Sequence, residues 1–172
     1  MIDKKIAITG HTRGFGKFLY DTLIEDNLVM GFSKSTGTDI TKRSDRKQMI
    51  ESISNCDVFI NCAQSGFFQT DVLYEVFKEW QDQKKMIINI GSNARDFTSR
   101  DRPYKYSVEK SALNLASKQL GRCGICRVST VDFGYLVRPT GEEDRSIITY
   151  EEAYSYVANI LASFGKSYRV LE

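Results

Sequence analysis

A tyrosine and a lysine four residues apart, Tyr106 and Lys110, are the residues of this sequence best suited to acid–base chemistry. In a helix, a four-residue step places both side chains on one face, one turn apart. An ammonium beside a phenol favours the phenolate and lowers the phenol pKa from about 10 toward working pH. The spacing therefore predicts a tyrosine general acid or base. Because the same spacing occurs by chance in many helices, other residues must support this prediction.

A glycine-rich stretch near the N-terminus reads Thr9-Gly10-His11-Thr12-Arg13-Gly14-Phe15-Gly16. It follows an apolar run typical of a strand and precedes an amphipathic stretch typical of a helix. Glycine permits a tight turn and a close approach of backbone to phosphate, and a helix N-terminus attracts anions. We therefore expect a nicotinamide dinucleotide here, bound by Gly10, Thr12, Arg13, Gly14, Phe15 and Gly16. The alternative is a strand–helix turn that is merely flexible.

The end of the second expected strand bears on which dinucleotide binds. It reads Gly31-Phe32-Ser33-Lys34-Ser35 and holds no carboxylate of the kind that binds the ribose 2′-hydroxyl of NAD. Ser33, Lys34 and Arg13 are suited to a 2′-phosphate. The sequence therefore favours NADP(H) over NAD(H), unless Lys34 and Arg13 are only solvated surface charges.

Short apolar runs alternate with longer amphipathic stretches, and this pattern predicts the elements that position these residues. Strands are expected at 5–9, 28–33, 58–61, 86–90, 125–131 and 168–171. Helices are expected at 14–25, from Ser44 onward, and at 70–83, 103–120 and 150–164. Strands that are apolar throughout indicate a parallel sheet covered on both faces. We expect an α/β fold, a Rossmann-type doubly wound parallel sheet with three layers (α/β/α), as a single domain spanning 1–172.

Composition narrows the class of protein. The chain is 41% hydrophobic and 27% charged with a net charge of +2, and its basic residues are scattered. No nucleic-acid or membrane partner is expected, and no apolar run is long enough to cross a bilayer. Without a signal-peptide pattern, a cytoplasmic protein with reduced cysteines is expected. Cys123 and Cys126 have the spacing of half a zinc site, but no second half is present, so no metal is expected.

Taken in order, several pieces of the sequence resemble the short-chain dehydrogenase/reductase family, of which this chain would be an unusually short member. They are the turn at 9–16, Asp39-Ile40, Asn61-Cys62-Ala63 in place of an Asn-Asn-Ala-Gly motif, Ser92 after the fourth strand, and Tyr106 with Lys110. The turn and the Tyr-Lys pair are specific in combination, and the other pieces support them.

The resemblance implies a role for each matching residue. Tyr106 would exchange a proton with the substrate oxygen, Lys110 would hold the nicotinamide ribose and lower the tyrosine pKa, and Ser92 would polarise the substrate carbonyl. Asp39 and Ile40 would flank the adenine, and Asn61 and Ala63 would line the cofactor channel. Gly134 matches the glycine of the family's Pro-Gly motif, which also contacts the cofactor.

The sequence also departs from the family pattern. The helix at 70–83 carries no asparagine to match a fourth catalytic residue, and Phe133 and Arg138 replace a proline and a threonine. The substrate-covering lid is reduced to 139–149.

The leading expectation is an NADP(H)-dependent oxidoreductase that interconverts a small-molecule carbonyl and an alcohol. The alternative is a non-catalytic NADP(H)-binding regulatory or assembly module. A homodimer or homotetramer is expected, because the apolar faces at 70–83 and 104–120 are expected to be exposed and resemble the helices through which family members associate.

Overall fold

The computed structural model describes residues 3–98, 103–137 and 147–164, and its centre is a five-stranded sheet. The strands are β1 (Lys5–Thr9), β2 (Leu28–Phe32), β3 (Val58–Asn61), β4 (Met86–Ser92) and β5 (Arg127–Phe133). They lie in the order β2-β1-β3-β4-β5, and every neighbouring pair is parallel. The predicted doubly wound parallel sheet is thus confirmed. Because all five strands run in the same direction, their C-terminal ends share one edge of the sheet, and ligands bind at that edge in such sheets.

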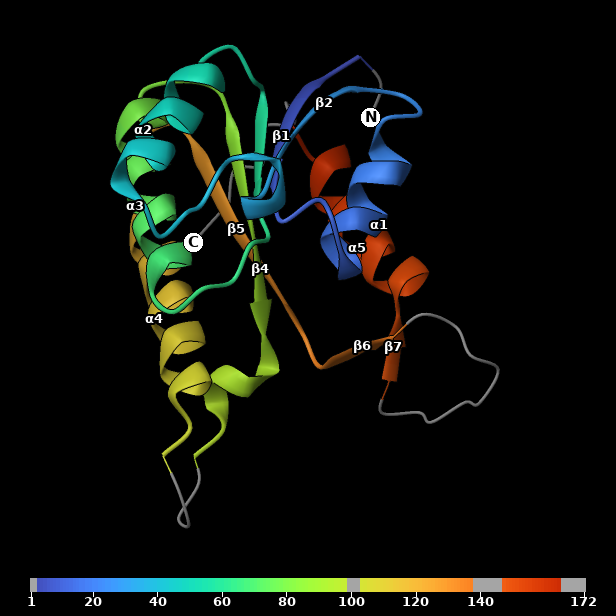
Figure 1. The fold of residues 1–172 in the computed structure, drawn as a ribbon, viewed down its shortest axis with the longest axis vertical. Helices are drawn as coiled ribbons and strands as arrows, with labels where there is room; N and C mark the ends of the chain where they lie inside the picture. Colours follow the sequence, from blue (N-terminus) through green and yellow to red (C-terminus); the bar gives the residue numbers. More distant parts are fainter. Residues whose placement is uncertain (1–2, 99–102, 138–146, 165–172) are drawn as a thin grey trace, which may run out of the picture.

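Helices cover both faces of the sheet, as Figure 1 shows. On one face lie α2 (Arg43–Ser52), α3 (Phe68–Trp80) and α4 (Lys105–Leu120), and on the other lie α1 (Gly14–Leu23) and α5 (Tyr150–Ala162). Neighbouring strand residues serve opposite layers: Ile87 packs with the α2–α4 layer, and Ile88 with the α1–α5 layer. Both are fully buried. Burial on both faces is why the central strands β1, β3 and β4 are rich in apolar residues and show no alternation with polar ones.

Some element bounds differ from the sequence prediction. Helix α3 begins at Phe68 rather than residue 70, because the Phe68 N–H donates to the Ser65 carbonyl. Strand β5 begins at Arg127 rather than residue 125, because the N–H groups of Ile125 and Cys126 donate to the Gln81 carbonyl at the end of α3 instead of to a neighbouring strand. The expected strand at 168–171 lies outside the described residues.

Beyond the main sheet, β6 (Tyr135–Val137) and β7 (Ile147–Thr149) form a short parallel pair that the sequence did not predict. A strand of three residues is too short to show a recognisable hydrophobic pattern in the sequence. β7 leads directly into α5, whose first turn is closed by a reciprocal cap between Thr149 and Glu152.

The apolar stripe of α3 forms part of the core, so the expectation that it is exposed for self-association is wrong. Val72, Leu73 and Val76 are fully buried. Helix α4 does expose Val108 and Leu115. Within the described ranges, no helix is long and apolar enough to cross a membrane, and no group of His, Cys, Asp or Glu side chains is arranged to hold a metal ion.

Candidate cofactor and catalytic site

A cavity of about 790 Å³ lies at the ligand-binding edge of the sheet, over the glycine turn. Gly10 adopts a φ of +79°, which other residues rarely adopt, and a Cβ there would meet the Ala63 Cα at 3.1 Å. A Cβ at Gly16 would overlap the Gly10 carbonyl. The turn is therefore as tight as a dinucleotide cradle requires. The predicted residues that line the cavity are Gly10, Thr12, Arg13, Gly14, Phe15, Gly16, Ser33, Lys34, Asp39, Ile40 and Ala63.

Two side chains fix the floor of this cradle. The buried Thr9 hydroxyl accepts the N–H groups of Cys62 and Ala63, both at 3.0 Å, and so ties the end of β1 to the loop after β3. The ring of His11 lies against Gly31 of β2, where a Cβ would overlap it, and 5.0 Å from the Tyr20 ring. His11 is thus a packing residue of the turn.

Asp39 brings a carboxylate to the end of β2, although the residues that directly follow this strand in the sequence include none. Asp39 forms a 3.1 Å ion pair with Lys34 and accepts the N–H and hydroxyl of Thr41 at 3.0 and 2.8 Å. Hydrogen bonds from Thr41, together with Lys34, lower the Asp39 pKa to about 2. Lys34 is therefore already paired at neutral pH, so it is not the free cation that the argument for a 2′-phosphate assumed.

Hydroxyl groups make up the rest of this end of the cavity. Ser33 lies 3.0 Å from Ser35 and 3.1 Å from Thr36, and Ser35 donates to Thr12 of the glycine turn at 3.1 Å. These side chains come from the end of β2, the short helix η1 (Lys34–Thr36) and the turn. Together with Arg13, they offer hydrogen-bond donors to an anionic group.

The loop that carries Asp39 and Ile40 is held from below by a buried arginine. Arg46 of α2 is 7% exposed, and its Nη1 donates to the Ile40 carbonyl at 2.8 Å. Its Nε and Nη2 pair with Glu75 of α3 at 2.9 Å. Such a two-pronged pair fixes geometry as well as charge. Arg46 therefore sets the position of the two residues expected to flank the adenine.

Ser92 and Tyr106 lie together at the same edge of the sheet. Ser92 ends β4, and its hydroxyl accepts the Ala94 N–H at 3.2 Å, which starts the short helix η2 (Asn93–Asp96). Partial burial raises the Tyr106 pKa, although hydrogen bonding with Ser92 acts in the opposite direction. For the chain without a cofactor, the expectation of a lowered phenol pKa is therefore wrong, because the desolvation of the phenol prevails.

Lys110 is a buried ammonium whose partners the sequence did not reveal. Its Nζ lies 5.5 Å from the centroid of the Tyr106 ring and donates to Gln69 Oε1 at 2.7 Å and to the Ile90 carbonyl at 3.0 Å. Burial lowers its pKa to about 8. Gln69 Nε2 in turn donates to the carbonyls of Asn61 and Ile90 at 2.8 and 3.1 Å. Gln69 thus joins the ends of β3 and β4 to Lys110, and no asparagine is needed for that contact.

Two of the predicted cofactor residues do not line the cavity. Asn61 is fully buried beneath it, where its Nδ2 donates to the Gln69 carbonyl at 2.8 Å and to Asn89 Oδ1 at 2.9 Å. Gly134 is exposed after β5 and is also absent from the cavity lining. The cavity includes residues that the sequence analysis did not select, namely Phe32, Ser35, Thr38, Thr41, Cys62, Gln64 and Ser65.

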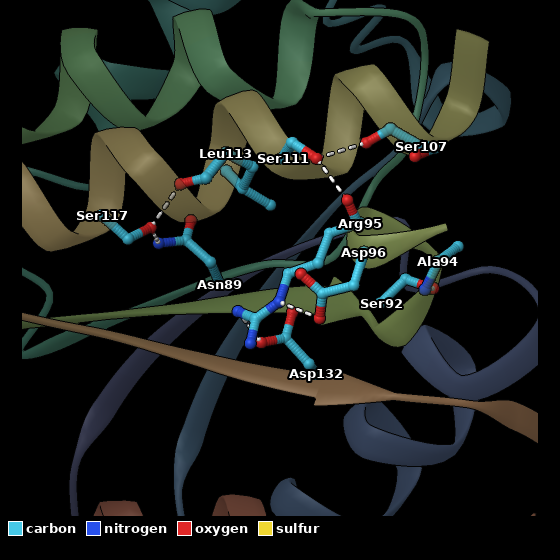
Figure 2. A network of polar contacts seen from close by, with 10 residues as sticks. All are labelled: Asn89, Ser92, Ala94, Arg95, Asp96, Ser107, Ser111, Leu113, Ser117 and Asp132. Atoms are coloured by element: carbon cyan, nitrogen blue, oxygen red, sulfur yellow. Dashed lines mark hydrogen bonds and ion pairs between the residues drawn. The ribbon is translucent and has the colours of Figure 1, made fainter. Parts of the chain in front are cut away.

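The loop that follows Ser92 is clamped in place, as Figure 2 shows. Arg95 reaches from η2 to Asp132 of β5, with Nη1 2.5 Å from Oδ2. On the other side of the loop, Ser111 of α4 donates to the Arg95 carbonyl at 2.5 Å. The guanidinium of Arg95 is thus paired with Asp132 and is not free to bind an anionic substrate.

No protein-family model and no curated protein matches this sequence. Solved structures do resemble the fold. A short-chain dehydrogenase from Leptospira borgpetersenii with bound NAD+ is 20% identical, with a TM-score of 0.66 over 81% of this chain and 74% of that one. One from Burkholderia cenocepacia in complex with NADP is 18% identical, with a TM-score of 0.73 over 94% and 85%. An apo SCOR enzyme from Clostridium thermocellum is 16% identical, with a TM-score of 0.76 over 96% and 89%.

These neighbours confirm the resemblance in fold that the sequence motifs indicated. The chain has the Rossmann-like fold of short-chain dehydrogenases, and structures of this fold occur with NAD+ and with NADP.

Proposed function

We propose that this protein is an NADP(H)-dependent oxidoreductase that interconverts a carbonyl and an alcohol. The observation that carries the proposal is the meeting of Ser92, Tyr106 and Lys110 at the sheet edge that also holds the dinucleotide-sized cavity. A protein that only binds a dinucleotide needs no phenol flanked by a hydroxyl and an ammonium.

When bound, the nicotinamide supplies or accepts the hydride at the carbonyl carbon. In the reducing direction, Tyr106 would give its proton to the carbonyl oxygen and would later regain a proton from solvent. Ser92 donates a hydrogen bond to the same oxygen and so stabilises the charge that develops there. The Lys110 ammonium, 5.5 Å from the centroid of the Tyr106 ring, would stabilise the phenolate left after proton transfer, although burial keeps the Tyr106 pKa raised in the chain without a cofactor.

Gln69 acts as a positioning residue in this proposal. Its Nε2 donates hydrogen bonds to two strand carbonyls, and this fixes the amide so that only Oε1 faces Lys110. One ammonium N–H of Lys110 is left over after the bonds to Gln69 and Ile90. That N–H is the group we assign to the nicotinamide ribose.

We also propose that the cofactor is NADP(H) rather than NAD(H). Asp39 neutralises Lys34, so the preference rests on Arg13 and on the hydroxyls of Thr12, Ser33 and Ser35. A 2′-phosphate would compete with Asp39 for Lys34, because phosphate carries more charge than a carboxylate.

The test is a binding titration of NADPH against NADH, followed by a screen of carbonyl compounds at the nicotinamide absorbance. We expect tighter binding of NADPH and turnover that falls at least 100-fold in Tyr106→Phe and in Ser92→Ala. Turnover that survives Tyr106→Phe unchanged would refute the proposed chemistry.

A second candidate, a non-catalytic NADP(H)-binding regulatory or assembly module, is favoured by the raised pKa of Tyr106. That module would bind NADPH tightly and reduce no carbonyl compound, so the same experiment separates the two.

We also propose that residues 1–172 form one domain and that this domain assembles into a homodimer or homotetramer through the exposed Val108 and Leu115 of α4. Sedimentation that shows only monomer at high concentration would contradict the assembly.

A further inference from the structure

Two half-exposed aromatic rings extend from the Tyr106 ring toward solvent. The Tyr104 ring lies 6.0 Å from the Tyr106 ring, and the Phe97 ring lies 5.6 Å from the Tyr104 ring in an edge-to-face contact. Tyr104 is 46% exposed and Phe97 is 54% exposed. We call Phe97, Tyr104 and Tyr106 the aromatic strip. Single exposed apolar residues are common, but contiguous rings that begin at the proposed acid are a feature of ligand sites.

The loop that presents Phe97 is fixed at several points. The Phe97 carbonyl accepts the Ser107 hydroxyl at 2.6 Å, and the Phe97 N–H donates to the Ala94 carbonyl at 3.1 Å. The clamp of Arg95 on Asp132 holds the preceding turn. Phe97 is therefore held in place by bonds to its own backbone, and its ring is left free to contact a ligand.

The charged side chains beside the aromatic strip are engaged elsewhere. Arg95 is paired with Asp132, and Asp96 is paired with Arg95 at 3.3 Å. The Lys105 ammonium lies over the ring of Phe67, 6.0 Å from its centroid. Among the described residues, the strip thus offers ring surface and no free ion to a molecule bound at Tyr106.

We propose that the aromatic strip binds a planar apolar group attached to the reacting carbonyl, so that the substrates are aryl aldehydes and ketones and the corresponding alcohols. This inference rests on the proposed function, because Tyr106 supplies both the proton and the first ring of the strip. A flat ring can stack on Tyr104 or meet the Phe97 edge while its carbonyl oxygen reaches Tyr106 and Ser92.

Two ketones with the same number of carbon atoms test the proposal: acetophenone, which carries a planar ring, and cyclohexyl methyl ketone, which carries a puckered one. We expect the wild type to reduce acetophenone with a kcat/KM at least tenfold higher. Phe97→Leu and Tyr104→Leu keep apolar bulk but remove the ring, and each should lower kcat/KM for acetophenone about 2- to 10-fold. The value for cyclohexyl methyl ketone should change less than twofold.

Tyr74→Leu is the matched control, because Tyr74 is a 44% exposed tyrosine on α3 away from the site. It should leave both ketones unaffected. Equal kcat/KM values for the two ketones in the wild type, or a preference that survives both strip variants, would overturn the proposal.

Binding without turnover separates this proposal from the proposed function. The ¹⁹F line of 4′-(trifluoromethyl)acetophenone should broaden when wild-type protein and NADP+ are added, and should narrow again with Phe97→Leu or Tyr104→Leu protein. If the wild type reduces neither ketone, the proposed function fails. The ¹⁹F result alone then decides whether the aromatic strip binds an aryl group. Equal broadening with all variants would refute the strip even if turnover is observed.

Discussion

Replacing the buried Lys110 with methionine should change how the stability of the protein depends on pH. Burial lowers the Lys110 pKa from 10.5 to about 8. One pKa unit corresponds to about 1.36 kcal/mol, so the charged ammonium costs the folded state up to about 3 kcal/mol at neutral pH. Between the two pKa values the unfolded chain binds more protons than the folded one, so stability rises with pH.

The size of this effect follows from the two pKa values. From pH 7 to pH 9, deprotonation of Lys110 in the folded chain adds about 1.3 kcal/mol to the free energy of unfolding. The buried thiols of Cys62 and Cys126 act in the opposite direction, since burial raises their pKa from 9.0 to about 11 and about 12, and this effect grows steeply as the pH rises past 9. The comparison therefore belongs between pH 7 and pH 9.

Urea unfolding of the wild type and of Lys110→Met at pH 7, 8 and 9 measures the effect. The difference in free energy of unfolding between the two proteins should shift by about 1.3 kcal/mol in favour of the wild type across this range. Lys84→Met removes an exposed lysine and is the control. The difference in free energy of unfolding between the wild type and Lys84→Met should not change from pH 7 to pH 9. A difference between wild type and Lys110→Met that stays constant from pH 7 to pH 9 would refute the idea that Lys110 is a desolvated ammonium.

Three further substitutions test how the cavity is built. Gly16→Ala places a methyl group against the Gly10 carbonyl, and calorimetric titration should show at least a tenfold loss of NADPH affinity; unchanged affinity would mean that the turn is not the cradle. Glu75→Gln removes the charge that Arg46 pairs with and should weaken NADPH and NADH binding alike, with a loss of about 1–3 kcal/mol in stability that thermal unfolding measures. Asp39→Asn frees Lys34 and should raise the ratio of NADPH to NADH affinity, about tenfold, in fluorescence titrations; a ratio that falls contradicts the assignment of Lys34.

The fold was predictable because its signals are local. Each central strand is an apolar run, and the glycine turn follows the first of them within ten residues of the N-terminus. The spacing of Tyr106 and Lys110 predicted a shared helix face, and the structure places them one turn apart on α4. Such features depend on neighbours in sequence, which a single chain reveals.

The contacts that tune the site were not predictable, because they join residues far apart in the chain. Gln69 and Lys110 are 41 residues apart, and nothing near either residue indicates the other. One signal was available: Gln69, Val72, Leu73 and Val76 have the spacing of one helix face, so a glutamine occupies a core-facing position. A polar residue there predicts a buried hydrogen bond, although not its partner.

The pairing of Asp39 with Lys34 could not be predicted from the sequence for a different reason. The segment between them has no strong secondary-structure signal, so its path could not be inferred from periodicity. A carboxylate seven residues past the end of β2 was therefore left out of the charge balance around the expected 2′-phosphate.

The paired amides of Asn61 and Asn89 also bear on how the chain reaches this fold. They face each other across β3 and β4 in register, and Asn89 continues to Ser117 at 3.0 Å. A slip of one residue would turn either amide into the opposite, apolar layer, at about 1–3 kcal/mol for each unpaired group. Parallel strands meet late and slowly because they are distant in sequence. The amide pair therefore disfavours pairings of β3 and β4 in the wrong register during folding. The variant Asn89→Val should refold more slowly or with extra phases in stopped-flow measurements.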